Sequence, residues 1–178
     1  VTQQEAEDFY AAMKTPGETE PVMYGMNSRL VKKDGVVQEE VWKIGGMYGE
    51  ALQKIVSWLD KAAEVAENDR QREVIRLLTE FYRTGDLKTF DAYSIVWLKD
   101  TDSQMDFVNG FIESYGDPLG IKASWESIVN FKDLEATRRT ELISENAQWF
   151  EDHSPVAPQF RKEKVKGVSA KVITAAGC

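Results

Sequence analysis

Apolar and polar positions change period several times along the chain, and the first change falls within residues 1–44. Thr2-Gln-Gln-Glu5 has capping-box spacing, so a helix is predicted to begin there and to end before the polar loop Thr15–Pro21. Two alternating segments follow, Ser28–Lys33 and Val36–Lys43, and Asp34-Gly35 separates them. Because this dipeptide accepts the positive φ angles of a type I′ turn, the two segments are predicted to form a β-hairpin.

Residues 45–100 carry apolar positions at a period near that of a helix and predict three helices with short connections. In the first of these, within 47–66, the apolar positions are Tyr48, Leu52, Ile55, Val56, Leu59, Ala63 and Ala66. Asn68 is placed to cap the second helix, and Gly85 is placed to end it in left-handed backbone. Asp86 is placed to cap the third helix, so the segment predicts a helical cluster.

Beyond this cluster the period of the apolar positions changes to two. The alternation predicts strands over Asp106–Gly116 and Ala123–Lys132, and a last strand over Val168–Ala175. Asp133 is placed to cap a long helix that ends before Pro155. The apolar positions of this helix that are predicted to lie in the core are Leu134, Leu142, Ile143, Trp149 and Phe150.

The predicted fold class is α+β, with a helical cluster packed on a mixed or antiparallel sheet. All 178 residues are expected to form a single domain-sized unit. Its parts are a helix plus hairpin (1–44), the helical cluster (45–100), and a strand–turn–strand with a long helix and final strand (101–178).

Charge and composition exclude several classes of partner and site. The net charge of −8 and the pI of about 4.8 argue against nucleic acid and anionic membranes as partners. No stretch approaches the ~18 apolar residues of a membrane-spanning helix, so no membrane insertion is expected. Cys178 is the only cysteine and His153 the only histidine, which excludes intramolecular disulfides, a cysteine-based metal cage and a histidine-rich metal site.

Polar side chains mark the two predicted strands on either side of the turn Gly116–Gly120. Asn109, Glu113 and Tyr115 share one face of the first strand, and Glu126 lies on the second. If the strands are neighbours, the carboxyls of Glu113 and Glu126 can approach one another. Three interpretations remain open. The carboxylates could face solvent, hold a cationic group such as a peptide amino terminus beside a tyrosine that donates to an oxyanion, or form a glycosidase-like acid/base pair.

Other candidate positions favour structural interpretations. His153 follows the long helix and is interpreted as a C-terminal cap rather than a catalytic base, since no partner constellation is evident. The mixed-sign run Arg161–Lys164 predicts a solvated loop, and Glu39-Glu40 lacks metal-ligand spacing. Five tryptophans are predicted to lie in the core rather than to form a binding platform: Trp42, Trp58, Trp97, Trp125 and Trp149.

The stretch NGFIESYGDPLGIKASWESIV (Asn109–Val129) resembles the strand–turn–strand of the dipeptidyl peptidase III family of zinc exopeptidases. Four more stretches resemble bacterial members of that family: MNSRLVKK (Met26–Lys33), GDLKTFDAYSIVWLKD (Gly85–Asp100), NFKDLEATRRTELI (Asn130–Ile143) and NAQWFEDHSPV (Asn146–Val156). The resemblance extends over almost the whole chain.

The resemblance implies a two-lobed enzyme that removes dipeptides from peptide amino termini. It places this chain in the lower lobe, in part of a β-barrel-like core. It implies that Glu113 holds the free amino group of the substrate, that Glu126 is a second acid near the amino-terminal subsites, and that Tyr115 supports the scissile carbonyl in the transition state. Asn109, in the same polar row, is assigned to substrate binding.

The H-E-x-x-G-H zinc motif of the family is absent from the sequence. The chain is therefore expected to be an internal fragment of a longer zinc peptidase, to bind no zinc itself and to be inactive alone. Its expected partners are a peptide substrate and the rest of the parent chain, and exposed sheet edges could pair two copies as a dimer. The resemblance places the parent in the cytoplasm or periplasm.

The alternative is a non-catalytic peptide-binding or interaction module that has kept the same strands. A reading frame that continues into an H-E-x-x-G-H helix would decide in favour of the peptidase.

Overall fold

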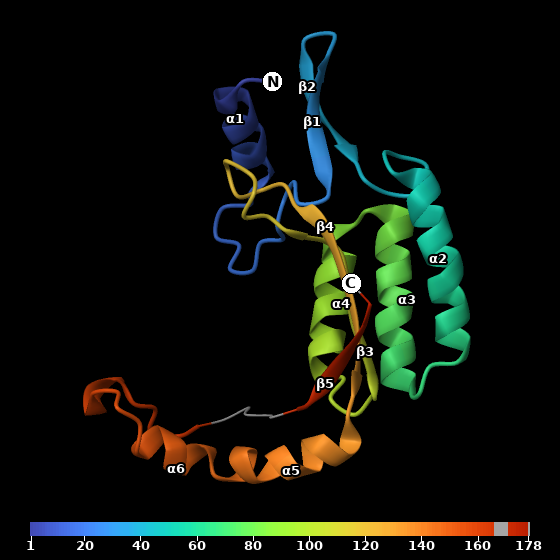
Figure 1. Ribbon diagram of the computed structural model, residues 1–178. Helices are drawn as coiled ribbons and strands as arrows, with labels where there is room; N and C mark the ends of the chain where they lie inside the picture. The colour runs from blue at the N-terminus through green and yellow to red at the C-terminus, as the bar shows by residue number, and fades with distance from the viewer. Residues whose placement is uncertain (166–170, 178) are drawn as a thin grey trace. The chain divides into compact units, whose positions relative to one another are not determined.

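The α+β class predicted from the two periods is confirmed by a computed structural model, which describes residues 1–165 and 171–177. Over these ranges the chain forms six α-helices, a short 3₁₀ helix and two small sheets (Figure 1). Within the same ranges, no helix is long and apolar enough to cross a membrane.

The chain divides into two compact units. Unit 1 comprises Val1–Ser103 and Asn109–Glu126, and unit 2 comprises Gln104–Val108 and Ser127–Cys178. Two of the strands cross from one unit to the other, whereas every helix belongs to a single unit.

Helix α1 (Gln3–Met13) begins at the predicted capping box. The Thr2 hydroxyl accepts a hydrogen bond from the Glu5 amide at 3.3 Å, and the Glu5 carboxylate accepts one from the Thr2 amide at 2.9 Å. The reciprocal bonds satisfy two amides that the first turn of a helix leaves without partners. The helix buries Tyr10, whose side chain is 4% exposed.

Strands β1 (Ser28–Lys33) and β2 (Val36–Val41) form the predicted antiparallel hairpin. Asp34 and Gly35 have φ angles of 50° and 81°, which are those of a type I′ turn. The second strand ends before Lys43, the predicted end, because the chain turns into an isolated parallel bridge after the hairpin.

Helices α2 (Gly49–Glu64), α3 (Asp69–Thr84) and α4 (Leu87–Lys99) form the predicted cluster, and α3 lies between the other two (Figure 1). The middle helix therefore buries apolar side chains on both sides. Its buried apolar residues are Val74, Ile75, Leu78, Phe81 and Tyr82. The main core of unit 1 lies along this helix.

The predicted caps of the cluster are all confirmed. Asn68 accepts from the Gln71 amide at 2.9 Å, and Asp86 accepts from the Thr89 amide at 2.9 Å. Gly85 ends α3 with a φ of 73°, the left-handed conformation that glycine adopts without steric cost.

Strands β3 (Met105–Glu113), β4 (Ser124–Lys132) and β5 (Ile173–Gly177) form a three-stranded sheet in the order β3-β4-β5. The last strand pairs antiparallel with β4. Of the predicted strand Val168–Ala175, residues 168–170 lie outside the described residues. The sheets have two and three strands, and neither closes on itself in the described part of the chain, so these residues alone do not form the expected barrel-like core.

The single long helix predicted after Asp133 is wrong, because the chain forms two helices there. They are α5 (Leu134–Glu145) and α6 (Ala147–Asp152), with a break at Asn146. The Asn146 side-chain amide donates to the Leu142 carbonyl at 2.8 Å. An asparagine that bonds local backbone in this way competes with the helical ladder, which accounts for the break.

The apolar face of α5 and α6 is exposed rather than buried. The five residues predicted to lie in the core are between 50% and 66% exposed: Leu134, Leu142, Ile143, Trp149 and Phe150. A short 3₁₀ helix, η1 (Pro158–Phe160), follows them. The helical period was identified correctly, but no described residue of unit 2 covers this face, so the prediction of burial is wrong.

Three of the five tryptophans are exposed, contrary to the prediction that they lie in the core, and Trp42 and Trp97 are half-buried. Trp58 is 69% exposed, Trp149 is 55% exposed and Trp125 is 37% exposed. The Trp58 ring lies under the ammonium of Lys61, 4.1 Å from the ring centroid, an exposed cation–π arrangement. Phe81, which is 1% exposed, and Tyr82, which is fully buried, hold the central positions instead.

Candidate functional site

The two predicted acids meet where β3 ends and β4 begins. Glu113 is the last residue of β3, and the Ser124 hydroxyl, at the start of β4, donates to the Glu113 carbonyl at 3.2 Å. The Glu126 carboxyl lies within hydrogen-bonding reach of the Glu113 carboxyl and, as the largest cause, raises the pKa of Glu113. Partial burial raises this pKa further. The strand pairing therefore creates a site where two carboxyl groups favour a shared proton or a bound cation.

We expect Glu126→Gln to raise the melting temperature near neutral pH, and we expect the gain to vanish on acidification. Folding raises the Glu113 pKa, so in the window between the unfolded and folded pKa values the folded state binds more protons. Stability therefore falls as pH rises through that window, and above it the two ionised carboxylates repel each other. Thermal unfolding across the acidic and neutral range measures this effect. A gain that is equal at every pH would contradict the pairing.

Tyr115 is not on the strand, contrary to the prediction that it shares a strand face with Glu113. The strand ends at Glu113, and Tyr115 lies in the following turn, where it is 88% exposed. The Asp117 amide donates to the Ser114 carbonyl at 3.1 Å and closes this turn early. The phenol is thus open to a bound ligand, but strand alternation does not fix its direction.

Asn109 is placed on β3 as predicted, with its oxygens bonded inside unit 1. The Tyr82 hydroxyl donates to the Asn109 side-chain oxygen at 2.5 Å and to its carbonyl at 2.9 Å. Burial raises the pKa of the Tyr82 phenol, so the hydroxyl stays protonated as a donor. This bond ties β3 to α3, and sequence reasoning missed it because a tyrosine at a helix core position gives no sign of its partner.

An apolar pocket of about 480 Å³ lies beside the acids and was also missed. Phe111 and Ser124 line it, and each precedes one of the glutamates by two residues and so shares its strand face. The Phe111 ring centroid lies 4.7 Å from that of Trp42 and 5.0 Å from that of Trp125. The remaining lining residues are Tyr48, Ala51, Leu52, Ile55 and Ala123. Its volume lies within the range of ligand pockets, about 300–1,000 Å³.

His153 occupies the position expected of a cap. It follows α6, and its Nδ1 lies 2.7 Å from the Trp149 carbonyl oxygen. No group of three or more His, Cys, Asp or Glu within 1–165 and 171–177 is arranged to hold a metal ion. The described residues therefore do not fit the zinc that the resemblance implies.

Comparison with known proteins agrees with the resemblance. A family model described as peptidase family M49 matches residues 23–172. Dipeptidyl peptidase 3 of Rattus norvegicus is 30% identical over 119 residues, which are 67% of this chain and 16% of the rat protein. The chain thus spans about a sixth of the length of this relative.

Two solved structures share the fold. Dipeptidyl peptidase III from Caldithrix abyssi superposes with a TM-score of 0.70 at 21% identity, over 92% of this chain and 30% of that one. The enzyme from Corallococcus sp. strain EGB gives a TM-score of 0.64 at 20% identity, over 98% of this chain and 32% of that one. Since the family match extends over most of the sequence, the chain belongs to peptidase family M49, the dipeptidyl peptidase III family.

Proposed function

We propose that this chain is the part of a longer dipeptidyl peptidase that binds the amino terminus of the peptide substrate. The observation that carries the proposal is the pairing of the Glu113 and Glu126 carboxyls at the junction of β3 and β4. The family membership supports it, because the family match over residues 23–172 includes both acids. In the two-lobed enzyme we place this region in the lower lobe, where further strands would complete the barrel-like core.

Two carboxylates form a suitable site for a peptide ammonium group. Each can accept a charge-assisted hydrogen bond, and a cation between them removes the repulsion that raises the Glu113 pKa. An internal peptide nitrogen carries no charge and gains nothing from the pair. The site therefore selects chain ends, as an exopeptidase requires.

The neighbouring groups extend this assignment. Two residues of the apolar pocket, Phe111 and Ser124, each lie two positions before one of the acids, about 7 Å away along the strands. An apolar side chain near the bound amino terminus can reach that distance. The exposed Tyr115 hydroxyl is the donor we assign to the scissile carbonyl, whose oxygen gains negative charge in the transition state.

Under this proposal, zinc would be bound by the longer protein and not by the described residues of this chain. The family is zinc-dependent, but the described residues offer no group that fits the metal. Residues in the rest of the longer protein would hold it. We therefore expect this chain alone to bind peptide termini without hydrolysing them.

In the longer protein that carries this chain, we expect Glu113→Gln to weaken binding of peptides with a free amino terminus about 10- to 100-fold. This corresponds to the loss of a hydrogen bond to a charged group, about 1.5–3 kcal/mol. Calorimetric titration with matched free and acetylated peptides measures the effect. Glu80→Gln, on the exposed side of α3, is the control and should leave binding unchanged. An equal loss on acetylated peptides would contradict ammonium recognition.

The non-catalytic binding module remains the alternative outcome. The same titration cannot separate it from the peptidase, since both bind amino termini. A gene whose reading frame includes H-E-x-x-G-H, together with hydrolysis that depends on Glu113, identifies the peptidase. Binding with no hydrolysis by the complete gene product identifies the module.

A further inference from the structure

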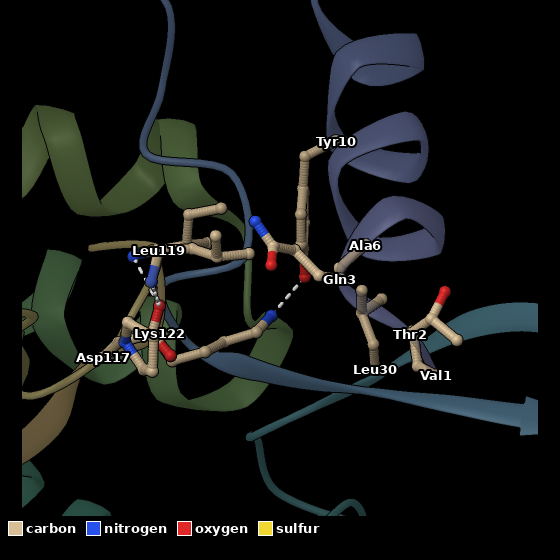
Figure 2. Close-up of a pocket in the computed structure, with 11 residues that line it drawn as sticks. Val1, Thr2, Gln3, Ala6, Tyr10, Leu30, Asp117, Leu119 and Lys122 are labelled. Atoms are coloured by element: carbon tan, nitrogen blue, oxygen red, sulfur yellow. Dashed lines mark hydrogen bonds between the residues drawn. The ribbon is translucent and has the colours of Figure 1, made fainter.

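The segment between Glu113 and Glu126 is held by a half-buried lysine, Lys122. Lys122 directly precedes Ala123, which is buried, and its ammonium points toward α1 (Figure 2). We propose that Lys122 is a positioning residue, whose contacts with α1 and β1 fix the start of β4 and thereby hold the Glu126 carboxyl beside that of Glu113. The consequence for peptide binding rests on the proposed function, whereas the hydrogen bonds of Lys122 do not depend on it.

Three oxygens accept hydrogen bonds from the Lys122 ammonium. They are the Gly25 carbonyl at 3.1 Å, the Ser28 hydroxyl at 3.2 Å and the Tyr10 hydroxyl. Three acceptors satisfy all three donors of an ammonium. Ser28 is 1% exposed and Tyr10 is 4% exposed, so two of the three acceptors lie on buried side chains. The connecting segment is thereby bonded to residues about a hundred positions earlier in the chain.

A carboxylate balances the charge of the Lys122 ammonium through the two hydroxyls. Glu39 of β2 accepts from the Ser28 hydroxyl at 2.5 Å and from the Tyr10 hydroxyl at 2.9 Å. Burial lowers the pKa of Lys122, while Glu39 and Asp117 oppose that shift. Each hydroxyl thus accepts from the cation and donates to the anion, a fully bonded network that orients every member.

Close packing at the centre of the network leaves room only for glycine at position 25. Gly25 has a φ of 86°, and a Cβ there would lie 2.6 Å from both the Tyr10 ring and the Ile121 side chain. Glycine thus lets the Gly25 carbonyl approach Lys122. The next contact along the segment is the Ala123 amide, which donates to the Met26 carbonyl at 3.0 Å. A two-point attachment therefore precedes β4 directly.

The turn at the other end of the segment is stabilised by separate hydrogen bonds to Asp117. The Asp117 carboxylate accepts from the Leu119 amide at 3.2 Å and from the Ile121 amide at 2.9 Å. These local bonds shape the turn, but they do not attach it to the rest of unit 1. That attachment comes from Lys122 and Ala123. Figure 2 shows Asp117 and Lys122 on the same side of a pocket of about 410 Å³ that α1 lines on the other side.

The test measures peptide affinity against pH in the complete protein that carries this chain, using a peptide with a free amino terminus. For Lys122→Met we expect Kd to rise about 10-fold at neutral pH and the loss of binding on acidification to move to lower pH. Separated carboxylates would return the Glu113 pKa toward its ordinary value. Removal of a positive charge would by itself raise that pKa rather than lower it, so a downward movement identifies separation.

Tyr10→Phe gives the second variant, because it removes one acceptor without changing charge and keeps the ring. We expect the same direction with a smaller change. Lys54→Met, on the exposed side of α2, is the charge-matched control and should bind as the wild type does. Wild-type affinity and pH profile in folded Lys122→Met would overturn the proposal. If that variant does not fold, the same result in Tyr10→Phe would overturn it.

Failure of this inference is distinct from failure of the proposed function. If Glu113→Gln abolishes the pH dependence of binding but Lys122→Met and Tyr10→Phe leave it unchanged, only the positioning role is wrong. If Glu113→Gln leaves binding and its pH dependence unchanged, the proposed function is wrong.

Discussion

Replacing Phe81 with alanine is expected to lower the free energy of unfolding by about 3–5 kcal/mol, the range for removal of a buried phenylalanine. Phe81 is 1% exposed and lies on α3, the helix between α2 and α4. Its ring centroid lies 4.9 Å from that of Phe90 and 5.6 Å from that of Tyr82. Alanine would leave a cavity between two helices, since close-packed neighbours relax only in part.

Urea titration followed by circular dichroism measures this loss, and Trp58→Ala is the matched control. Trp58 lies on α2, is 69% exposed and contacts the ammonium of Lys61. Its removal should cost no more than about 1 kcal/mol, the value of an exposed cation–π pair. Similar losses in the two variants would show that the helical cluster does not form the core of unit 1.

Replacing Tyr115 with phenylalanine in the longer protein is expected to lower kcat about 10²- to 10³-fold, as loss of one oxyanion donor does in other enzymes. The substitution removes only the hydroxyl, and the ring is already 88% exposed, so folding should not change. KM should change little, because a developing oxyanion gains more from the donor than the ground-state carbonyl does.

Steady-state kinetics on a peptide with a free amino terminus test this expectation. Tyr24→Phe removes a phenol hydroxyl elsewhere in unit 1 and should leave kcat unchanged. An unchanged kcat in Tyr115→Phe would remove Tyr115 from the mechanism. A rise in KM alone would instead make it a substrate-binding residue.

The elements that sequence predicted well are those whose bonds connect close neighbours in the chain. The Thr2 capping box and the Asn68 cap each join residues three positions apart. The hairpin turn at Asp34-Gly35 needs only the φ angles that these two residues accept. Such bonds form within one turn of chain, so the sequence carries their complete description.

Burial was predicted less well, because it depends on what covers a face. The helical period of α5 is real, but Leu142 and Ile143 are more than half exposed among the described residues. A period tells which side chains share a face, and another part of the protein has to supply the covering surface. The same reason explains why Trp58 lies outside the core while Phe81 lies inside.

The candidate site combines both kinds of information. The sequence by itself determined the family and the alternation that puts Glu113 and Glu126 on strands flanking a turn. Only the tertiary structure decided that their carboxyls meet, that Tyr115 leaves the strand, and that Lys122 bonds with Tyr10 across 112 positions. The physical reason is that contacts between distant residues follow no period along the chain, and they form only when the packed elements bring the side chains together.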